Sequence, residues 1–483
     1  MTPGGKKARV VDLFCGAGGL SLGFHAAGCA IQKMVDFDSA AAITAEHNFQ
    51  GLLEENTSVL GGPQEGDLDQ MDPSELFPRG ELDLLLGGPP CQAFSLAGRA
   101  KLNHLRGNFA DDPRNSLYKR FLSALKSCQP RSFVMENVAG MMSVKGVNLA
   151  EGIAAELSRC GYRVGYNVLN AVRYGVPQFR ERIFFIGYRN DLGIAPSLPP
   201  APCSARTIRT TDIPSGYGSS GLDGTGLLPG MIEESLRIDP PALNNPGPAI
   251  TVSEALDDLP KLVDHLDGQY RRGSRDFRIP MDYPMKAHSG FAELMRSGWP
   301  GFNAGYSIDD HCVRRTPRDY ETFRRMNHGD RYPQAIRIAK DRFQEELLRR
   351  GSTAPHPESE EFAVLEAKFV PPYGRKDDYQ QHPDRWRKLY PEEPSWTLPA
   401  HLSKDSYSHI HHDHDQARMI SVREAARLQS FPDGFKFKGN LGDCFRQIGN
   451  AVPPLLSWHI GAHILEALGM EFTPAPNFHD RVC

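Results

Sequence analysis

Apolar residues in the first part of the chain form short runs that alternate with stretches of helical periodicity. Runs rich in Val, Ile, Leu and Phe predict strands at 8–14, 29–35, 82–88, 132–138, 162–169 and 182–188. Between them, apolar positions at helical spacing predict helices at 19–27, 39–49, 116–128 and 149–160. This alternation is typical of parallel βαβ units, so we predict an α/β domain with a doubly wound sheet and helices on both faces.

The pattern changes after residue 190, where stretches rich in Pro, Gly and Ser indicate surface loops. From about 259 to 394 the chain is irregular, polar and rich in Arg, His and Tyr, with one predicted helix at 332–350. Helical periodicity returns at 421–429 and 453–468. A second, irregular domain therefore interrupts the ordered one.

These changes of pattern give the expected domain boundaries. We predict an ordered domain at 1–190 that is completed by 440–483, and a second domain with a loop-rich linker at 191–439. The formal net charge of the chain is −4, yet residues 261–350 hold 18 Lys and Arg against 13 Asp and Glu. A local basic excess alone does not distinguish a polyanion-binding face from an ordinary solvated surface.

Cysteine spacing and hydropathy bear on the compartment. The nine cysteines are widely spaced and form no CxxC pair of the kind that holds zinc or a redox dithiol. No apolar run approaches the roughly 18–20 residues that cross a bilayer, and the chain opens with polar residues rather than a signal sequence. We therefore expect a cytoplasmic protein with no membrane partner.

A glycine-rich turn follows the first predicted strand in the sequence DLFCGAGG, which contains Gly16, Gly18 and Gly19. Glycines there let a ligand approach the backbone, and an acidic residue about 20 positions later binds ribose hydroxyls. Asp36 stands 20 residues after Gly16, at the end of the next strand. Phe37 is placed to cover an adenine ring, and Asp67 to accept from the adenine amino group. The turn alone fits any doubly wound protein, but with both acidic residues it predicts a nucleoside ligand.

Two further predicted strands end in residues that carry chemistry. In LLLGGPPCQ, a strand ends in a Pro-Pro turn that presents Cys91. In SFVMENV, Glu136 lies at the end of an apolar strand. Most cysteines are inert buried residues, and a carboxyl group at a strand end also caps helices. Reactive groups nevertheless collect at the carboxyl ends of strands in open α/β sheets, and a thiolate is a strong nucleophile. This placement favours Cys91 as a nucleophile and leaves Glu136 open between capping and catalysis.

The sequence VPQFRERIFFIG sets Gln178, Arg180 and Arg182 at alternate positions. This spacing predicts that the three side chains share one strand face before an apolar run begins. Two guanidinium groups on such a face require anionic or carbonyl partners. The alternative to a ligand contact is a structural salt bridge with Glu181 or another carboxylate.

Taken in order, these motifs resemble those of the bacterial-type DNA cytosine-C5 methyltransferases, which move a methyl group from S-adenosylmethionine to carbon 5 of cytosine. The resemblance rests on DLFCGAGG, GGPPCQ, ENV, QFRERIFFIG, SVREAARLQSFPD and QIGNAVPP, over residues 9–190 and 418–468. It implies a Rossmann-like methyltransferase sheet, S-adenosylmethionine as the ligand of the glycine turn, and a target-recognition domain at 191–439.

The resemblance also implies the roles of individual residues. The family's catalytic positions fall on Cys91, Glu136, Arg180 and Arg182. Its cofactor contacts fall on Phe14, Gly16, Gly19, Asp36, Phe37, Asp67, Leu68 and Asn450. The implied mechanism is attack of the Cys91 thiolate on cytosine C6, with a protonated Glu136 near N3 and Arg182 on O2. Arg180 orients the group around Cys91, and the base must be flipped out of the duplex. Segment 94–106 resembles the mobile loop that closes over the flipped base.

Two features near these motifs have structural interpretations. HIHHDHD, with His409, His411, His412 and His414, looks like a metal cluster, but the family mechanism uses no metal and we predict none. Cys15, a second thiol near the site, is interpreted as a packing residue.

The resemblance implies an enzyme that acts on a specific double-stranded DNA sequence, with a cognate restriction or phage-defence system, and the chain length favours a monomer. A transfer-RNA cytosine methyltransferase is an alternative, although those enzymes have little in the region where this chain has a long insertion. A catalytically silent DNA-binding paralogue is another, and the intact catalytic motifs argue against it. The recognition region matches no readable code.

Overall fold

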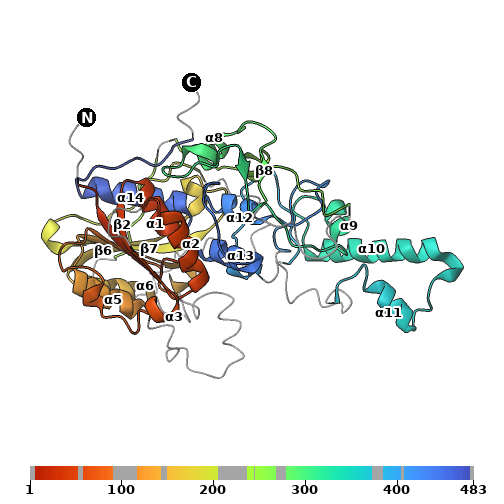
Figure 1. The fold of residues 1–483 in the computed structure, drawn as a ribbon, viewed down its shortest axis with the longest axis horizontal. Helices are drawn as coiled ribbons and strands as arrows, with labels where there is room; N and C mark the ends of the chain where they lie inside the picture. The colour runs from red at the N-terminus through yellow and green to blue at the C-terminus, as the bar shows by residue number, and fades with distance from the viewer. Residues whose placement is uncertain are drawn as a thin grey trace, which may run out of the picture. The chain divides into compact units, whose positions relative to one another are not determined.

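The computed structural model describes residues 6–52, 58–90, 117–142, 149–204, 236–243, 245–267, 279–372, 385–403 and 407–478. The chain divides into two compact units. Unit 1 consists of Met1–Ile250 and Ala451–Cys483, and unit 2 of Thr251–Asn450. Unit 2 is inserted between the two parts of unit 1. In Figure 1, unit 1 therefore contains both the red N-terminal and the blue C-terminal end of the chain.

Unit 1 is built on a seven-stranded sheet of order β3-β2-β1-β4-β5-β7-β6. Its strands are β1 (Arg9–Leu13), β2 (Ala30–Asp36), β3 (Ser58–Gly61), β4 (Leu84–Gly87), β5 (Ser132–Val138), β6 (Tyr162–Asn170) and β7 (Glu181–Arg189). Strands β1 to β5 pair in parallel, as predicted. Strand β7 is antiparallel to both of its neighbours, because the short connection 171–180 joins it directly to β6 without a crossover helix.

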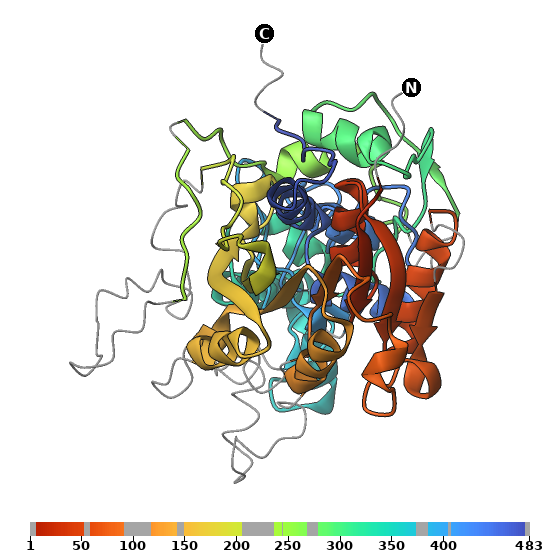
Figure 2. The same cartoon turned by 90° about the vertical axis from the view of Figure 1, so that its left-hand side faces the viewer.

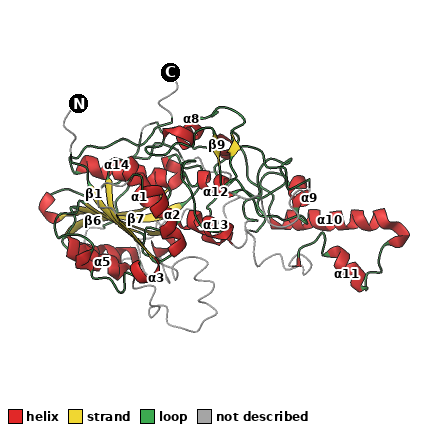
Figure 3. Cartoon of the chain, viewed as in Figure 1, coloured by secondary structure: helices red, strands yellow, loops and turns green. Residues whose placement is uncertain are grey.

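Helices cover both faces of this sheet, which confirms the predicted doubly wound α/β fold (Figure 3). They are α1 (Gly19–Ala26), α2 (Ser39–Phe49), the short α3 (Gly62–Glu65), α5 (Leu117–Cys128), α6 (Leu149–Ser158) and α14 (Pro454–Ala467). Figure 2 shows α14 in dark blue beside α1 in red. A Cβ atom on Gly23 of α1 would lie 2.3 Å from the Pro454 carbonyl oxygen, so a glycine is required for this close packing.

The core of unit 1 lies between the sheet and helices α5 and α6. Strand residues Val11, Leu85 and Phe133 are fully buried there, together with Phe121 and Leu157 of the helices. These apolar side chains come from the runs that predict the strands and helices, so burial of those runs accounts for the alternation seen in the sequence.

Unit 1 reaches further along the chain than the predicted boundary at 190. The backbone N–H of Tyr166 in β6 donates to the Leu236 carbonyl at 3.0 Å, and the Asn167 side chain donates to the Ile238 carbonyl at 2.7 Å. Strand β6 is the edge of the sheet, and its outer backbone groups take these partners from beyond the loop-rich stretch. The second part of unit 1 begins at Ala451 rather than at 440.

Unit 2 contains short elements joined by long irregular segments, as the sequence predicts. Its helices are α7 (Val252–Leu256), α8 (Gly290–Glu293), α9 (Tyr320–Arg325), α10 (Tyr332–Arg350), α11 (Glu360–Glu366), α12 (Val422–Leu428) and α13 (Leu441–Asn450). A two-stranded sheet pairs β8 (Met281–Asp282) with β9 (Ser307–Ile308). The bounds of α10 equal those predicted. The ring of Phe343 in α10 packs edge-on against the ring of Phe362 in α11, with 5.1 Å between the ring centroids.

The motif SVREAARLQSFPD forms α12 and a buried ionic network inside unit 2. Ser421 caps the helix with Glu424 in a reciprocal capping box. Arg418 pairs with Glu424 at 2.6 Å, and Arg427 pairs with Asp433 at 2.6 Å, all four being buried. Because removing one partner of such a pair leaves a buried charge, loss of any of these four side chains should destabilise unit 2.

Candidate active site

The glycine-rich turn between β1 and α1 has a left-handed backbone at three of its residues. Phe14, Gly16 and Gly18 have φ values of 58°, 56° and 90°. A Cβ atom on Gly18 would lie 2.6 Å from the ring of Phe49, so the close approach also requires a glycine. Gly19 then begins α1 and is buried. The turn therefore presents its backbone at the carboxyl end of β1.

Asp36 and Gly16, which stand 20 residues apart in the sequence, are in direct contact. The Gly16 N–H donates to Asp36 Oδ2 at 2.7 Å, and the Asp38 N–H donates to Oδ1 at 2.8 Å. Burial raises the pKa of the Asp36 carboxyl, while these two backbone hydrogen bonds oppose the rise. The carboxyl group is thus held at the edge of the glycine turn.

Two other predicted cofactor contacts lie at the same end of the sheet. Phe37 follows Asp36 directly, and 59% of its surface is exposed. A Cβ atom on Gly66 would lie 2.1 Å from the Asp36 carbonyl oxygen, so the backbone before Asp67 runs against the end of β2. Leu68 is buried in the core of unit 1. An exposed aromatic ring beside an acidic residue is what a nucleoside site needs.

Asp67 has local partners that the sequence did not reveal. Its carboxylate accepts from the Asp69 N–H at 2.9 Å and from Gln70 Nε2 at 2.9 Å. Asn450, the last predicted cofactor contact, is the exposed C-terminal residue of α13 in unit 2. Its contact with the cofactor stays a prediction.

Glu136 lies where three strand ends converge. A Cβ atom on Gly88 would lie 3.3 Å from Glu136 Oε2, and the Gly88 N–H donates to the Leu13 carbonyl at 3.2 Å. Arg182 pairs with Glu136, its Nε lying 3.0 Å from Oε1. Burial raises the pKa of Glu136, and the charges of Arg182 and Arg180 oppose that rise. The group that the sequence left open between capping and catalysis is therefore a buried, ion-paired carboxyl.

Of the three residues predicted to share one strand face, only Arg182 belongs to β7. Strand β7 begins at Glu181, so Gln178 and Arg180 precede it. Arg180 is fully buried, and its Nη2 donates to the Ala451 carbonyl at 2.9 Å. The Ala171 N–H donates to the Arg180 carbonyl at 2.8 Å, so backbone pairing with the end of β6 extends to the residue before β7, and a shared face for the three side chains stays a prediction. Both guanidinium groups still act on Glu136.

Asn137 is a residue of this site that the sequence argument did not single out. Its side chain is buried and donates from Nδ2 to the Pro89 carbonyl at 2.9 Å. Pro89 stands two positions before Cys91 in the sequence GGPPC, so Asn137 anchors the turn that leads to the predicted nucleophile. Cys91 itself and segment 94–106 lie outside the described residues. The available signal was a second polar residue after Glu136 in an apolar strand.

Asp12 is a second acidic group that the sequence argument missed. It is fully buried in β1, accepts from Ser21 Oγ at 2.6 Å, and has its pKa raised to about 7 by burial, with the nearby Asp36 adding to the rise. Cys15, interpreted as a packing residue, is buried, and its pKa is raised well above the usual range. Burial therefore keeps this second thiol protonated and unreactive.

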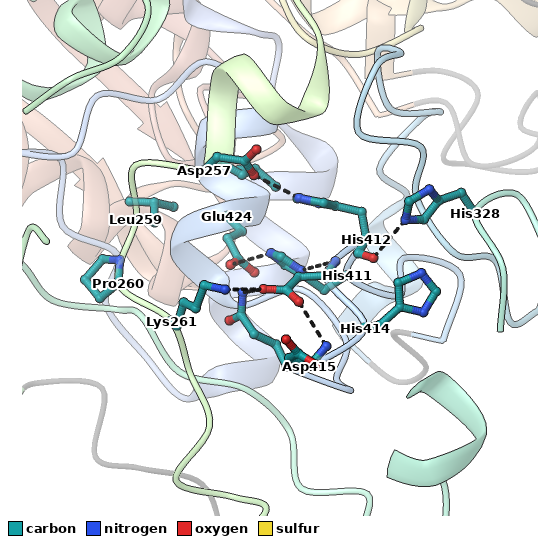
Figure 4. Close-up of a pocket in the computed structure, with 13 residues that line it drawn as sticks. Asp257, Leu259, Pro260, Lys261, His328, His411, His412, His414, Asp415 and Glu424 are labelled. Carbon is teal, nitrogen blue, oxygen red and sulfur yellow. Dashed lines mark hydrogen bonds and ion pairs between the residues drawn. The ribbon is translucent and has the colours of Figure 1, made fainter. Parts of the chain in front are cut away.

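Three of the histidines of HIHHDHD, His411, His412 and His414, line a pocket of about 500 Å³ in unit 2 (Figure 4). His412 pairs with Asp257 at 2.8 Å, and His411 lies 3.4 Å from Glu424. In the part of the chain that the structure describes, no three His, Cys, Asp or Glu side chains are arranged to hold a metal ion. Nor is any helix there long and apolar enough to span a membrane.

The fold and the site define an α/β enzyme with a glycine-rich turn beside an acidic residue and a largely buried glutamate–arginine pair at neighbouring strand ends. The family model for C-5 cytosine-specific DNA methylase matches residues 8–466, and the chain belongs to this family. Its enzyme class is therefore DNA (cytosine-5)-methyltransferase, which confirms the resemblance seen in the motifs.

Relatives of known name support this assignment. A protein of Oceanobacillus iheyensis named as a type II methyltransferase is 34% identical over 463 residues, which cover 94% of each chain. Type II methyltransferase M.AgeI of Thalassovita gelatinovora is 30% identical over 470 residues, covering 93% of this chain and 97% of the relative. A solved structure from E. coli, named as a DNA modification methyltransferase encoded within a prophage, has the same fold. It has a TM-score of 0.57 at 23% identity and covers 96% of this chain and 100% of that chain.

Proposed function

We propose that this protein methylates carbon 5 of cytosine within one specific double-stranded DNA sequence, with S-adenosylmethionine as methyl donor. The reaction proceeds through a covalent bond between Cys91 and C6 of a flipped-out base. The observation that carries the proposal is the pair of buried Glu136 and half-buried Arg182, which lies beside the turn leading to Cys91. Membership of the family supports the reaction class.

The residues at the glycine turn fit the cofactor. S-adenosylmethionine supplies an electrophilic methyl group when bound. Asp36 holds the turn through the Gly16 N–H, accepts from the Asp38 N–H as well, and keeps lone pairs to accept from ribose hydroxyls. Phe37 offers an exposed ring to the adenine, and Asp67 accepts from its amino group. We assign the remaining contacts to Phe14, Gly16, Gly19, Leu68 and Asn450.

The base-binding residues explain how the ring becomes reactive. Addition of the Cys91 thiolate to C6 converts the ring into an enamine that is nucleophilic at C5. Glu136 is protonated near N3, where its raised pKa favours a donor, and it absorbs the charge that builds on the ring. Arg182 holds O2, and Arg180 orients the group around Cys91. Loss of the C5 proton and elimination of the thiol then restore enzyme and base.

The biological setting we propose is restriction-modification or phage defence in the cytoplasm. Relatives named as type II methyltransferases cover nearly the whole chain. In this proposal residues 191–439 read the DNA sequence, the enzyme acts as a monomer on one strand at a time, and a cognate restriction or defence protein cuts unmethylated DNA.

A side-by-side assay tests this proposal. Purified protein is given radiolabelled S-adenosylmethionine with either duplex DNA or transfer RNA, and we expect label in DNA only. Label in transfer RNA alone would favour the RNA enzyme, and label in neither would favour the silent paralogue. Bisulfite sequencing of DNA from expressing cells should show complete methylation of one short motif. Scattered, context-independent methylation would contradict the restriction-modification role.

A further inference from the structure

We propose that Asn170 is a positioning residue for the base-binding arginines. Its side chain fixes the start of β7 and, through it, Arg180 and Arg182. The proposal rests on the proposed function, because it takes these arginines and Glu136 as the groups that contact the cytosine. Asn170 itself touches no reacting atom.

Asn170 closes the connection between β6 and β7. It is the last residue of β6 and lies opposite Glu181, the first residue of β7. Its Oδ1 accepts from the Arg180 N–H at 3.1 Å and from the Val172 N–H at 3.3 Å. Beside it, the Ala171 N–H donates to the Arg180 carbonyl at 2.8 Å. Both backbone groups of Arg180 are therefore held by two consecutive residues.

The rest of the connection between β6 and β7 is tightly packed and has little freedom to adjust when the hydrogen bonds of Asn170 are lost. Val172, Tyr174 and Val176 are buried, and Gly175 turns the chain with φ of 78°. A short buried connection of this kind transmits a shift at one end to the other, because close-packed interiors leave no room for compensating motion. Asn170 Oδ1 is the acceptor for one backbone N–H at each end of this connection, that of Val172 and that of Arg180.

The hydrogen bonds of Asn170 set the position of Arg182 relative to Glu136. Arg182 follows two residues after the held backbone of Arg180 and lies opposite Val138 and Leu169 in the sheet. Its Nε then reaches Glu136 Oε1 at 3.0 Å. Loss of the Asn170 acceptor leaves the Arg180 N–H without its partner, releases the start of β7, and weakens the contact between Arg182 and Glu136.

These contacts predict that loss of the Asn170 acceptor shifts the pH dependence of kcat, which general destabilisation does not do. Arg182 lowers the pKa of Glu136, so displacing it raises that pKa. If the protonated Glu136 is the active form, kcat falls when the pH rises above this pKa. Releasing Arg182 therefore moves the alkaline fall in kcat to higher pH, whereas a partly unfolded enzyme loses activity equally at every pH.

The test compares Asn170→Leu, which keeps the size but removes the acceptor, with Asn170→Asp, which keeps an acceptor oxygen. We expect kcat of N170L to fall about 10- to 100-fold, as for a misplaced catalytic group, with the KM for S-adenosylmethionine unchanged. N170D should stay within about threefold of wild type. Asn167→Ala is the matched control, because Asn167 lies on the same strand but bonds to Ile238 and Asp239. It should lower the melting temperature without moving the pH profile.

Wild-type kcat and pH profile in N170L would overturn the positioning role, as would an N170D variant that is as slow as N170L. Glu136→Gln separates this result from failure of the proposed function. If E136Q retains the wild-type alkaline limb, the proposed role of Glu136 is wrong. In that case, comparing the kcat of N170L with that of N170D still decides whether the hydrogen bonds of Asn170 position the site.

Discussion

Nε of Arg182 lies 3.0 Å from Oε1 of Glu136, and this ion pair joins the ends of strands β7 and β5. Burial favours the protonated form of Glu136, whereas the charges of Arg182 and Arg180 favour the ionised form. Opposed influences of this kind are typical of a carboxyl group that changes its protonation state during a reaction.

Replacing Glu136 by Gln keeps a hydrogen-bond donor near the base but removes the acidic proton that a general acid transfers. We expect kcat to fall about 10²- to 10⁴-fold, the usual contribution of a general acid, with little change in DNA affinity. Single-turnover methyl transfer and a binding titration measure the two quantities. A rate within threefold of wild type would show that Glu136 only holds Arg182 in place.

Replacing Cys91 by Ser should abolish methyl transfer, because a hydroxyl near neutral pH offers almost no anion while a thiol offers a few per cent. DNA binding should survive. Duplex DNA with 5-fluorocytosine at the target should trap the wild-type enzyme covalently, since fluorine does not leave as a proton does. Trapping is read as a band of reduced mobility on a denaturing gel, and a C91S enzyme that still forms this band would contradict the assignment.

Replacing Asp36 by Ala should weaken S-adenosylmethionine binding by about 1–3 kcal/mol, the cost of losing hydrogen bonds to a charged acceptor. The variant loses the ribose contact and the anchor of the Gly16 N–H together. Titration calorimetry measures the affinity, and the effect should appear mainly in the cofactor KM.

Asp38→Ala is the matched control for Asp36. Asp38 caps α2 by accepting from the Ala40 and Ala41 N–H groups, so its loss should lower stability but leave cofactor affinity unchanged. Unchanged affinity in the Asp36 variant as well would refute the ribose role.

Acid should destabilise unit 2 through its buried histidines. His265, His311, His409 and His411 are buried, and burial lowers their pKa, to about 3 for His409 and about 4 for the other three. The unfolded chain binds these protons at a higher pH than the folded one, so the free energy of unfolding falls as the pH drops from about 7 toward 4. Between pH 7.5 and pH 5 we expect a loss on the order of 1–2 kcal/mol for each histidine, measured by urea unfolding.

Two variants test the origin of this acid sensitivity. His311→Gln removes one buried titrating group, so the difference in unfolding free energy between the two pH values should shrink. His356→Gln removes an exposed histidine and should leave the difference unchanged. Equal acid sensitivity in H311Q and wild type would assign the effect to other groups.

Salt should identify the DNA-binding face, because protein groups that neutralise phosphates release counterions. Arg271, Arg272 and Arg275 belong to the basic segment 261–350 but lie outside the described residues. Replacing all three by Gln should reduce the slope of log affinity against log salt by about 0.9 for each phosphate that the variant no longer neutralises. The control replaces Arg79, Arg159 and Arg163, three exposed arginines of unit 1, and should leave the slope unchanged. Equal slopes in the two triple variants would mean that the predicted cluster is only solvated surface.

The sequence alone determined the fold class and the reaction class. Alternating apolar runs predict the parallel strands and their helices because burial of one face imposes a period on the chain. The contact between Gly16 and Asp36 was predictable in the same way, since parallel strands bring their carboxyl ends to one edge.

Only the tertiary structure decided which polar side chains meet. Nothing in the spacing of Glu136 and Arg182 shows that their strands are neighbours, because strand order follows from packing of the whole sheet. The same holds for Asn137, which reaches Pro89 across 48 residues, and for Asn170, which reaches Arg180 across 10 residues. Hydrogen bonds of this kind depend on distances of a few tenths of an ångström, and a hydrophobic pattern does not contain that information.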